Sequence, residues 1–234
     1  MTDFEQSAQA LIAQGRYNEA ASAYSQIDMN RLSDPSERMG QLLLICELYL
    51  DGDDFVRAEH FCTAAEAVGV EEKSLKLRLW LAQARLLDFR LKYAEACSKF
   101  LTVSEDVDVG IDDRKQVFEK ALPCFLLCPL SIARTRLVKR ISSSCLVALL
   151  GQEVSALIGM ISNSKMVYNA EGYVTLLPFS PHHLALHGNG LSAFKNAIID
   201  YNFYAVSLQR SEISLVEVCE FLGFAEVDDF LFKE

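Results

Sequence analysis

The sequence predicts an all-α protein in which a TPR-like helical-repeat solenoid is followed by a partial winged-helix end. Three observations support this fold class. Small and aromatic residues recur at one constant offset, and each copy contains two amphipathic stretches joined by a short polar turn. The C-terminal part also has the order of helices that opens a winged helix.

Five positions recur in three copies of the repeat, with a small residue in each helix and an aromatic residue that opens the second helix. They are Ala8, Leu11, Tyr17, Ala20 and Tyr24, then Cys46, Tyr49, Phe55, Ala58 and Cys62, then Ala84, Leu87, Tyr93, Ala96 and Phe100. Small residues let the paired helices approach closely. A helical hairpin of this length cannot bury its apolar face alone, so the copies are expected to stack.

Helical periodicity begins near the N-terminus and covers the repeat. It runs from about Asp3 to Val107, with breaks near residues 28–37 and 69–72. Asp34 is followed by Pro35, and a polar cap before a proline in the first turn is typical of a helix start. The helical pairs are therefore expected to restart after each break.

Further helices are predicted beyond the strict repeat. One opens at Asp112 and continues to Pro123, and the next covers residues 131–141. Two more stretches, residues 145–150 and 152–161, are separated by a glycine.

The chain divides by composition into three parts. Residues 1–163 form the helical-repeat array, and residues 164–190 form a linker that contains two prolines and three glycines. Residues 191–234 form the truncated winged-helix portion, where a first helix is followed by Leu215–Leu222 and by the start of a third, Ala225–Phe232.

Composition and charge disfavour several classes of function. The 234 residues carry a net charge of −10, which disfavours indiscriminate binding to nucleic acid or to an anionic membrane. The most apolar stretch, Cys145–Ile161, is too short for a membrane span and has Gln152 and Glu153 at its centre. We expect no secretory leader, so the seven cysteines are expected to be reduced thiols in a protein of the cytoplasm and the nucleus.

No residue pattern predicts catalysis, a cofactor or a metal. The acidic run that begins at Asp51 lacks the glycine and the glutamate of a calcium loop, because Val56 and Cys62 hold those places. His183 and His187 are four residues apart, but a proline and a glycine bracket them and no further ligand lies at a suitable spacing. We therefore expect a protein that is not an enzyme.

A basic cluster stands out in this acidic chain. It consists of Arg134, Arg136, Lys139 and Arg140, all within one predicted helix. A solvated helix face is the ordinary explanation of such a cluster. The alternative is a docking patch for an acidic helix of a partner protein.

Five segments of the chain resemble one known family. They are Glu47–Ala65, Ala84–Phe100, Lys120–Ile141, Leu177–Leu186 and Phe194–Phe224. The second is the most specific, because ARLLDFRLKYAEA resembles the pattern AR-x-LD[YF]R-x-K[FY]-x-EA. The resemblance is to the PCI-domain family, which the proteasome lid, the COP9 signalosome and translation initiation factor 3 share, and within it to the COP9 signalosome subunit 4 group.

This resemblance implies a non-catalytic scaffold that holds neighbouring subunits and supports cullin deneddylation. The implied partners are other signalosome-type PCI subunits and cullin-RING ligases, and the zinc-dependent isopeptidase activity of such complexes belongs to another subunit. An alternative in the same class is a PCI subunit of the proteasome lid or of translation initiation factor 3.

A different class is nucleic-acid binding through the helix-turn-helix. It is disfavoured because Glu226, Asp228 and Asp229 would face the phosphates.

The resemblance also identifies apolar residues near the C-terminus as candidate contacts. The family has further N-terminal repeats, a two-stranded wing and a long C-terminal helix, and we expect this chain to lack them. Without strands to cover them, Ile213, Phe221, Phe224 and Phe230 are expected to present an apolar surface to a partner.

Overall fold

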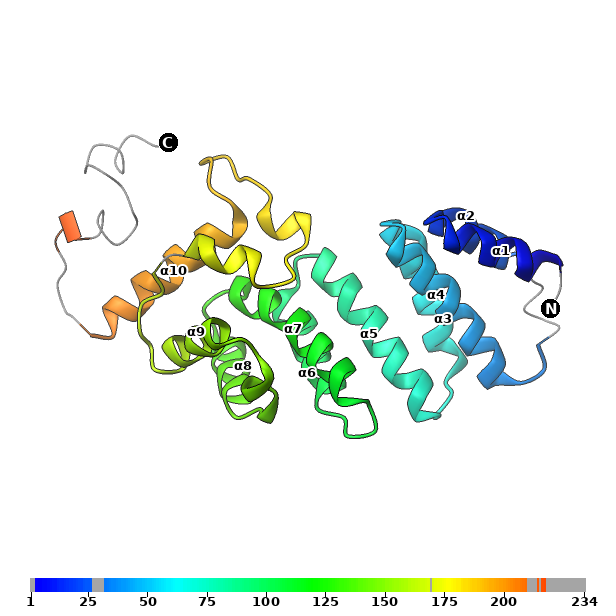
Figure 1. Ribbon diagram of the computed structural model, residues 1–234, viewed down its shortest axis with the longest axis horizontal. Helices are drawn as coiled ribbons and strands as arrows, with labels where there is room; N and C mark the ends of the chain where they lie inside the picture. The colour runs from blue at the N-terminus through cyan, green and yellow to red at the C-terminus, as the bar shows by residue number, and fades with distance from the viewer. Residues whose placement is uncertain (1–2, 27–31, 169, 210–213, 215, 218–234) are drawn as a thin grey trace. The chain divides into compact units, whose positions relative to one another are not determined.

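The computed structural model describes residues 3–26, 32–168, 170–209, 214 and 216–217. These residues form helices and loops with no strand, apart from an isolated antiparallel bridge between Leu186 and Ser192 (Figure 1). The predicted all-α class is confirmed. The chain folds into two compact units, residues 1–99 (unit 1) and 100–234 (unit 2). The domain boundaries predicted at residues 163 and 190 stay predictions.

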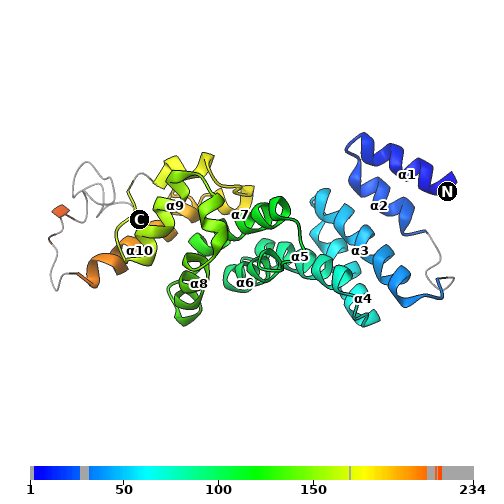
Figure 2. The same cartoon turned by 60° about the horizontal axis from the view of Figure 1, so that its bottom comes forward.

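Unit 1 is built of paired helices. They are α1 (Asp3–Ala13), α2 (Tyr17–Tyr24), α3 (Pro35–Asp51), α4 (Phe55–Val68), α5 (Lys73–Phe89) and α6 (Tyr93–Ser104), which continues into unit 2. From α1 to α5, each helix packs against the next one along the chain. Helix α3 also packs against α5, so equivalent helices of successive copies are in contact, as a stacked repeat requires (Figures 1 and 2).

The turn inside each helical pair has the same backbone geometry in all three copies. Gly15, Asp53 and Leu91 hold equivalent places in the repeat and have φ angles of 72°, 57° and 59°, in the left-handed region. The next N–H in each copy donates to the carbonyl oxygen five residues back at 2.9 Å, from Arg16 to Leu11, from Asp54 to Tyr49 and from Lys92 to Leu87. These bonds form a Schellman motif, which satisfies the last carbonyls of the first helix. The repeat is therefore present in the backbone as well as in the side chains.

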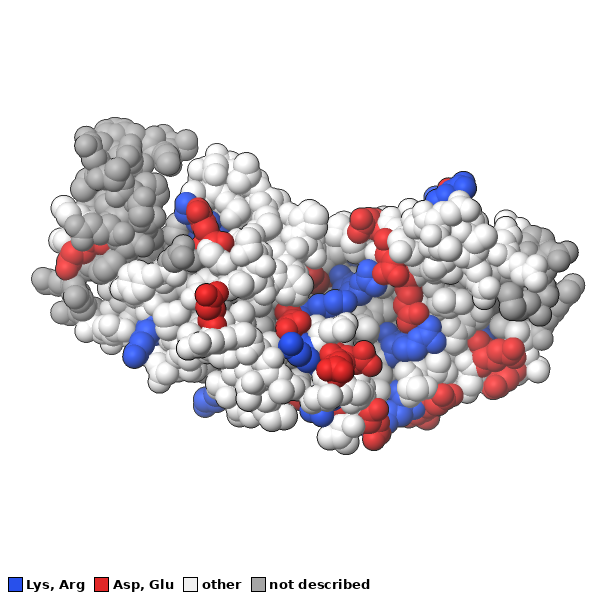
Figure 3. Space-filling view, in the orientation of Figure 1, with Lys and Arg blue, Asp and Glu red and all other residues white. Residues whose placement is uncertain are grey.

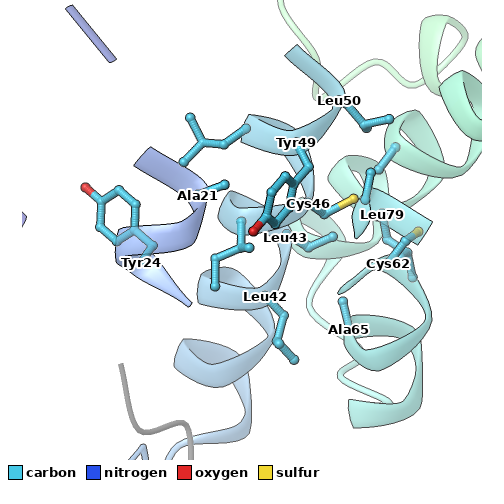
Figure 4. Close-up of a cluster of buried hydrophobic side chains, with 14 of the residues drawn as sticks. Ala21, Tyr24, Leu42, Leu43, Cys46, Tyr49, Leu50, Cys62, Ala65 and Leu79 are labelled. Atoms are coloured by element: carbon cyan, nitrogen blue, oxygen red, sulfur yellow. The ribbon is translucent and has the colours of Figure 1, made fainter. Parts of the chain in front are cut away.

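The small residues of the repeat lie where helices cross. All six have no exposed surface, namely Ala8, Ala20, Cys46, Ala58, Ala84 and Ala96. Around the second copy, Leu43, Cys46, Ala65 and Leu79 bring α3, α4 and α5 together in one apolar cluster (Figure 4). The register predicted from the offset is confirmed.

Charged residues of unit 1 pair across the repeat outside this core. Arg78 donates two hydrogen bonds to Glu47, at 2.9 and 2.7 Å, and Arg85 donates one to Asp51 at 2.8 Å. Both pairs join α5 to α3, and where Figure 3 shows unit 1, acidic and basic side chains lie side by side. Each partly exposed pair adds at most about 1 kcal/mol, so the apolar core holds the unit together.

Unit 2 combines longer helices with short 3-10 turns. Its elements are α7 (Ile111–Leu127), α8 (Ile132–Ser142), η2 (Cys145–Leu149), α9 (Gln152–Ser162), η3 (Ala170–Thr175), η4 (Pro181–Leu184) and α10 (Ala193–Ser207). Helix α7 continues to Leu127, past Pro123, where the sequence predicted its end. Proline removes one helical hydrogen bond, but every residue from Pro123 to Leu127 is buried and this packing keeps the helix intact.

Buried polar side chains of α10 fasten the predicted linker to unit 2. The Tyr201 hydroxyl donates to the carbonyl oxygen of Lys165 at 3.0 Å. Asn202 accepts from the N–H of Val167 at 2.8 Å and donates to its carbonyl oxygen at 2.9 Å. Ser164 has a φ of 52°, so α9 ends in a left-handed turn like the turns inside the helical pairs. This turn directs the segment of Lys165 and Val167 toward α10. The linker segment is therefore packed against α10 in this region.

Replacing a small residue at a helix crossing should collapse unit 1. Ala58→Arg puts a guanidinium into a site with no exposed surface, which should cost about 3 kcal/mol or more. Ala96→Arg should do the same in the third copy. Thermal unfolding followed by circular dichroism measures both. The control is Ala67→Arg on the exposed face of α4, and equal melting of Ala58→Arg and this control would contradict the register.

Relieving the strained turn should stabilise the third copy. Leu91 has an exposed side chain and a left-handed backbone, which a residue with a Cβ adopts at a cost. Leu91→Gly should be more stable than Leu91→Ala by about 1 kcal/mol, since both lose the side chain and only one removes the strain. Urea unfolding compares them. Equal midpoints would mean that this turn is not left-handed in solution.

Alkaline pH should weaken unit 2 through Tyr201. Burial raises the pKa of Tyr201 to about 12, above the ordinary value of about 10 for tyrosine. The folded state therefore holds the phenol proton more tightly, and this contribution is complete below pH of about 10 and lost between about 10 and 12. Tyr201→Phe should lower stability at pH 8 by about 1 kcal/mol and flatten the fall above pH of about 10. Urea midpoints across this range test it, and identical pH slopes for both proteins would count against it.

Candidate partner-binding surface

Helix α8 carries the predicted basic cluster, and its start is determined locally. Ser131 lies just before the helix in extended backbone, and its hydroxyl accepts a hydrogen bond from the N–H of Arg134 at 3.3 Å. This is an ordinary N-cap. The cap determines where α8 begins, and packing against neighbouring helices then determines which basic side chains turn inward.

Arg134 is buried, so its assignment to an exposed basic patch is wrong. Only 4% of its surface is exposed. Its guanidinium carbon lies 5.1 Å from the ring centroid of Phe125 in α7 and 5.3 Å from that of Tyr201 in α10. Cation–π contacts of this kind are favourable in a desolvated site. Arg134 thus packs between two helices of unit 2.

Hydrogen bonding explains why this arginine is buried rather than solvated. Its guanidinium donates to the carbonyl oxygen of Leu126 at 3.2 Å and to that of Cys128. These carbonyls end α7, where a helix has no donors of its own. A guanidinium offers five donors, so one side chain satisfies several such acceptors. Arg134 therefore stabilises the fold and is not available to a partner.

Arg140 is half-buried and already paired within unit 2. It donates to both carboxylate oxygens of Glu105 at 2.8 and 2.7 Å, and to the Thr102 hydroxyl at 2.9 Å. This two-pronged geometry is the stronger form of an arginine–carboxylate pair. The pair fastens α8 to the end of α6 and lowers the charge that Arg140 presents to solvent.

Arg136 and Lys139 are the members of the cluster that face solvent. Ile132 precedes them on the same helix and is 76% exposed. Positions 132, 136 and 139 are four and three residues apart, so their side chains lie along one face. We call Ile132, Arg136 and Lys139 the α8 stripe.

The α8 stripe combines an apolar end with a basic end. Leu130, just before the helix, is 41% exposed and extends the apolar end. An acidic amphipathic segment fits such a surface, because its apolar residues cover the isoleucine and its carboxylates meet the two cations. The sequence pattern indicated the charges but missed Ile132, whose exposure depends on the rotation of α8.

The other predicted contact residues cannot be placed. Ile213, Phe221, Phe224 and Phe230 lie outside the described residues, as does most of the predicted winged-helix portion. Of that portion the structure describes α10, which begins after Ser192, whose hydroxyl accepts from the N–H of Lys195 at 3.1 Å. The four apolar contacts and the winged helix therefore stay predictions.

Asp54 and His183 have structural roles within their own units. The Asp54 carboxylate caps α4, accepting from the N–H of Arg57 at 3.1 Å. His183 is buried, and its Nδ1 accepts from the N–H of Ser180 at 3.0 Å in the cap of η4. His187 is exposed beyond that turn, so the two histidines do not share a helix face.

Most of the described cysteines are buried. Burial raises the pKa of the Cys128 thiol, so the reactive thiolate is disfavoured there. Cys145 is the exposed thiol among the described residues. None of the described helices combines the length and the apolar character that crossing a bilayer requires.

Comparison with known proteins points to one type of subunit. No protein-family model matches this chain. COP9 signalosome complex subunit 4 of Emericella nidulans is 26% identical over 227 residues, which cover 95% of this chain and 55% of that protein. The same subunit of Drosophila melanogaster is 27% identical over 196 residues, with coverage of 81% and 47%. That of Arabidopsis thaliana is 26% identical over 134 residues, with coverage of 52% and 34%.

These relatives confirm the predicted resemblance to COP9 signalosome subunit 4 across most of the chain. The chain spans about half the length of the first two relatives.

Proposed function

We propose that this protein is a non-catalytic scaffold subunit of a COP9 signalosome-like complex and supports cullin deneddylation. The observation that carries the proposal is the stacked repeat, whose turn geometry recurs three times within a region similar to subunit 4. Stacked helical pairs bury a continuous core and leave extended faces for partners. The predicted partners are other signalosome-type PCI subunits and cullin-RING ligases, in the cytoplasm and the nucleus.

The distribution of polar groups supports a scaffold. Acidic and basic residues of unit 1 neutralise one another across the repeat, as Glu47 and Arg78 do. Arg134 satisfies backbone carbonyls within unit 2. Polar contacts of this kind fix the helices relative to one another within each unit. The surfaces that partner subunits would bind are then held in a constant geometry.

Within this proposal, the α8 stripe is a contact for an acidic helix of a neighbouring subunit. Its cations stand on a rigid helix, held by the Arg140–Glu105 pair. Such charges raise the rate of association and select partners of opposite sign. Ile132 supplies apolar area, and burying this area against the partner would slow dissociation.

Affinity purification of the tagged protein at its native expression level tests the assignment. Quantitative mass spectrometry should recover signalosome subunits and cullins in excess over an untagged control. Recovery of proteasome lid subunits alone, or of initiation factor and ribosomal proteins alone, would contradict the proposal in favour of another PCI assembly.

Charge reversal of the α8 stripe should weaken assembly without unfolding the chain. Arg136→Glu combined with Lys139→Glu should slow association with the purified partner subunits about tenfold at low salt, since both charges face solvent. Stopped-flow or surface-based kinetics at several salt concentrations measures the effect. The matched control is Lys92→Glu with Lys165→Glu, which reverses two other exposed lysines. Equal slowing by both double variants would show only a net-charge effect.

A further inference from the structure

A cleft of about 370 Å³ opens in unit 2 where α9 begins. Three elements line it. Glu119 comes from the middle of α7, Glu153 and Val154 from the first turn of α9, and Leu176 and Leu177 from the residues just after η3. This volume is at the lower end of the range of ligand pockets, about 300–1,000 Å³, and suits one long side chain with a neighbour.

Apolar side chains form the floor of the cleft and part of its rim. Val154 and Leu177 are each 6% exposed and form the floor. Leu176 at the rim is 44% exposed, and Leu150 also contributes to the lining. Covering this surface would remove apolar area from water, which favours binding of an aliphatic chain.

Both charged residues of the described lining are acidic. Glu119 and Glu153 come from different helices and meet at the same cleft. Lys115 contacts Glu119 at 3.7 Å from one turn earlier in α7, but does not belong to the lining. Burial, and then the charge of the Glu153 carboxylate, raise the pKa of the Tyr173 phenol. The cleft thus presents negative charge above an apolar floor.

Charge and shape together select the occupant. Glu119 is already paired with Lys115, so it is chiefly Glu153 that would repel an anion, and a wholly apolar group would desolvate this carboxylate without a partner. A cation on an aliphatic stem avoids both penalties, because its stem covers the leucines while its head pairs with a carboxylate. Arginine and lysine have this form.

We propose that the cleft at the start of α9 binds an arginine or lysine side chain, together with an adjacent apolar residue, from a basic segment of a partner protein. This site differs from the α8 stripe, which selects acidic segments. Binding at this cleft does not depend on which complex the chain enters. A negative result for the cleft would therefore leave the proposed function untouched, and the reverse also holds.

Methyl NMR of the full chain tests the proposal with a defined probe. The probe is the dipeptide acetyl-Leu-Arg amide, and acetyl-Leu-citrulline amide is its neutral counterpart of nearly the same shape. The arginine probe should shift the methyl signals of Val154, Leu176 and Leu177 saturably. The citrulline probe should bind at least fivefold more weakly, and salt should weaken only the arginine probe.

Variants assign the effect to the cleft. Glu153→Gln should weaken the arginine probe about tenfold and leave the citrulline probe unchanged. Glu171→Gln removes the same charge from a side chain that is 82% exposed outside the lining, and should leave both probes unchanged. Absence of saturable shifts, equal binding of both probes, or tighter binding of acetyl-Leu-Glu amide would each overturn the proposal.

Discussion

Close approach of paired helices at small residues is the constraint on which unit 1 depends. Ala20, Ala58 and Ala96 occupy the same place in three successive copies, and none of them has exposed surface. A larger side chain there would push the helices apart and disturb the neighbouring pair as well, because each copy packs on the next. The constant period of the repeat is therefore a packing requirement.

The repeated turn shows how far this constraint can override local preference. A left-handed residue is needed after each first helix, and glycine meets that need at Gly15. Asp53 and Leu91 take the same conformation at a cost, since the surrounding helices determine the path of the chain. Local sequence preference alone would not predict a left-handed residue at Leu91. The constant offset of the repeat does predict it, because Leu91 is equivalent to Gly15.

The buried positions and turns of unit 1 could be predicted from the sequence because they depend on neighbours within one repeat. Unit 2 was less predictable, because its key contacts join residues far apart in the chain. Arg134 is covered by Tyr201, which comes from a helix much later in the sequence, and no local pattern separates it from Arg136, which faces solvent. The cleft beside Glu153 was missed for the same reason, since α7, α9 and the segment after η3 meet there only in the fold. Both surfaces follow from how the helices rotate and pack.

Native-state hydrogen exchange of the purified chain tests the stacked repeat most directly. The N–H groups of Arg16, Asp54 and Lys92 close equivalent turns, and each donates at 2.9 Å to a carbonyl of the preceding helix. If the three copies are stacked in one register, all three amides should exchange slowly compared with the amide of Glu71, an exposed residue in the loop between α4 and α5. Fast exchange at any one of them, or protection that does not recur at the same offset, would contradict the repeat.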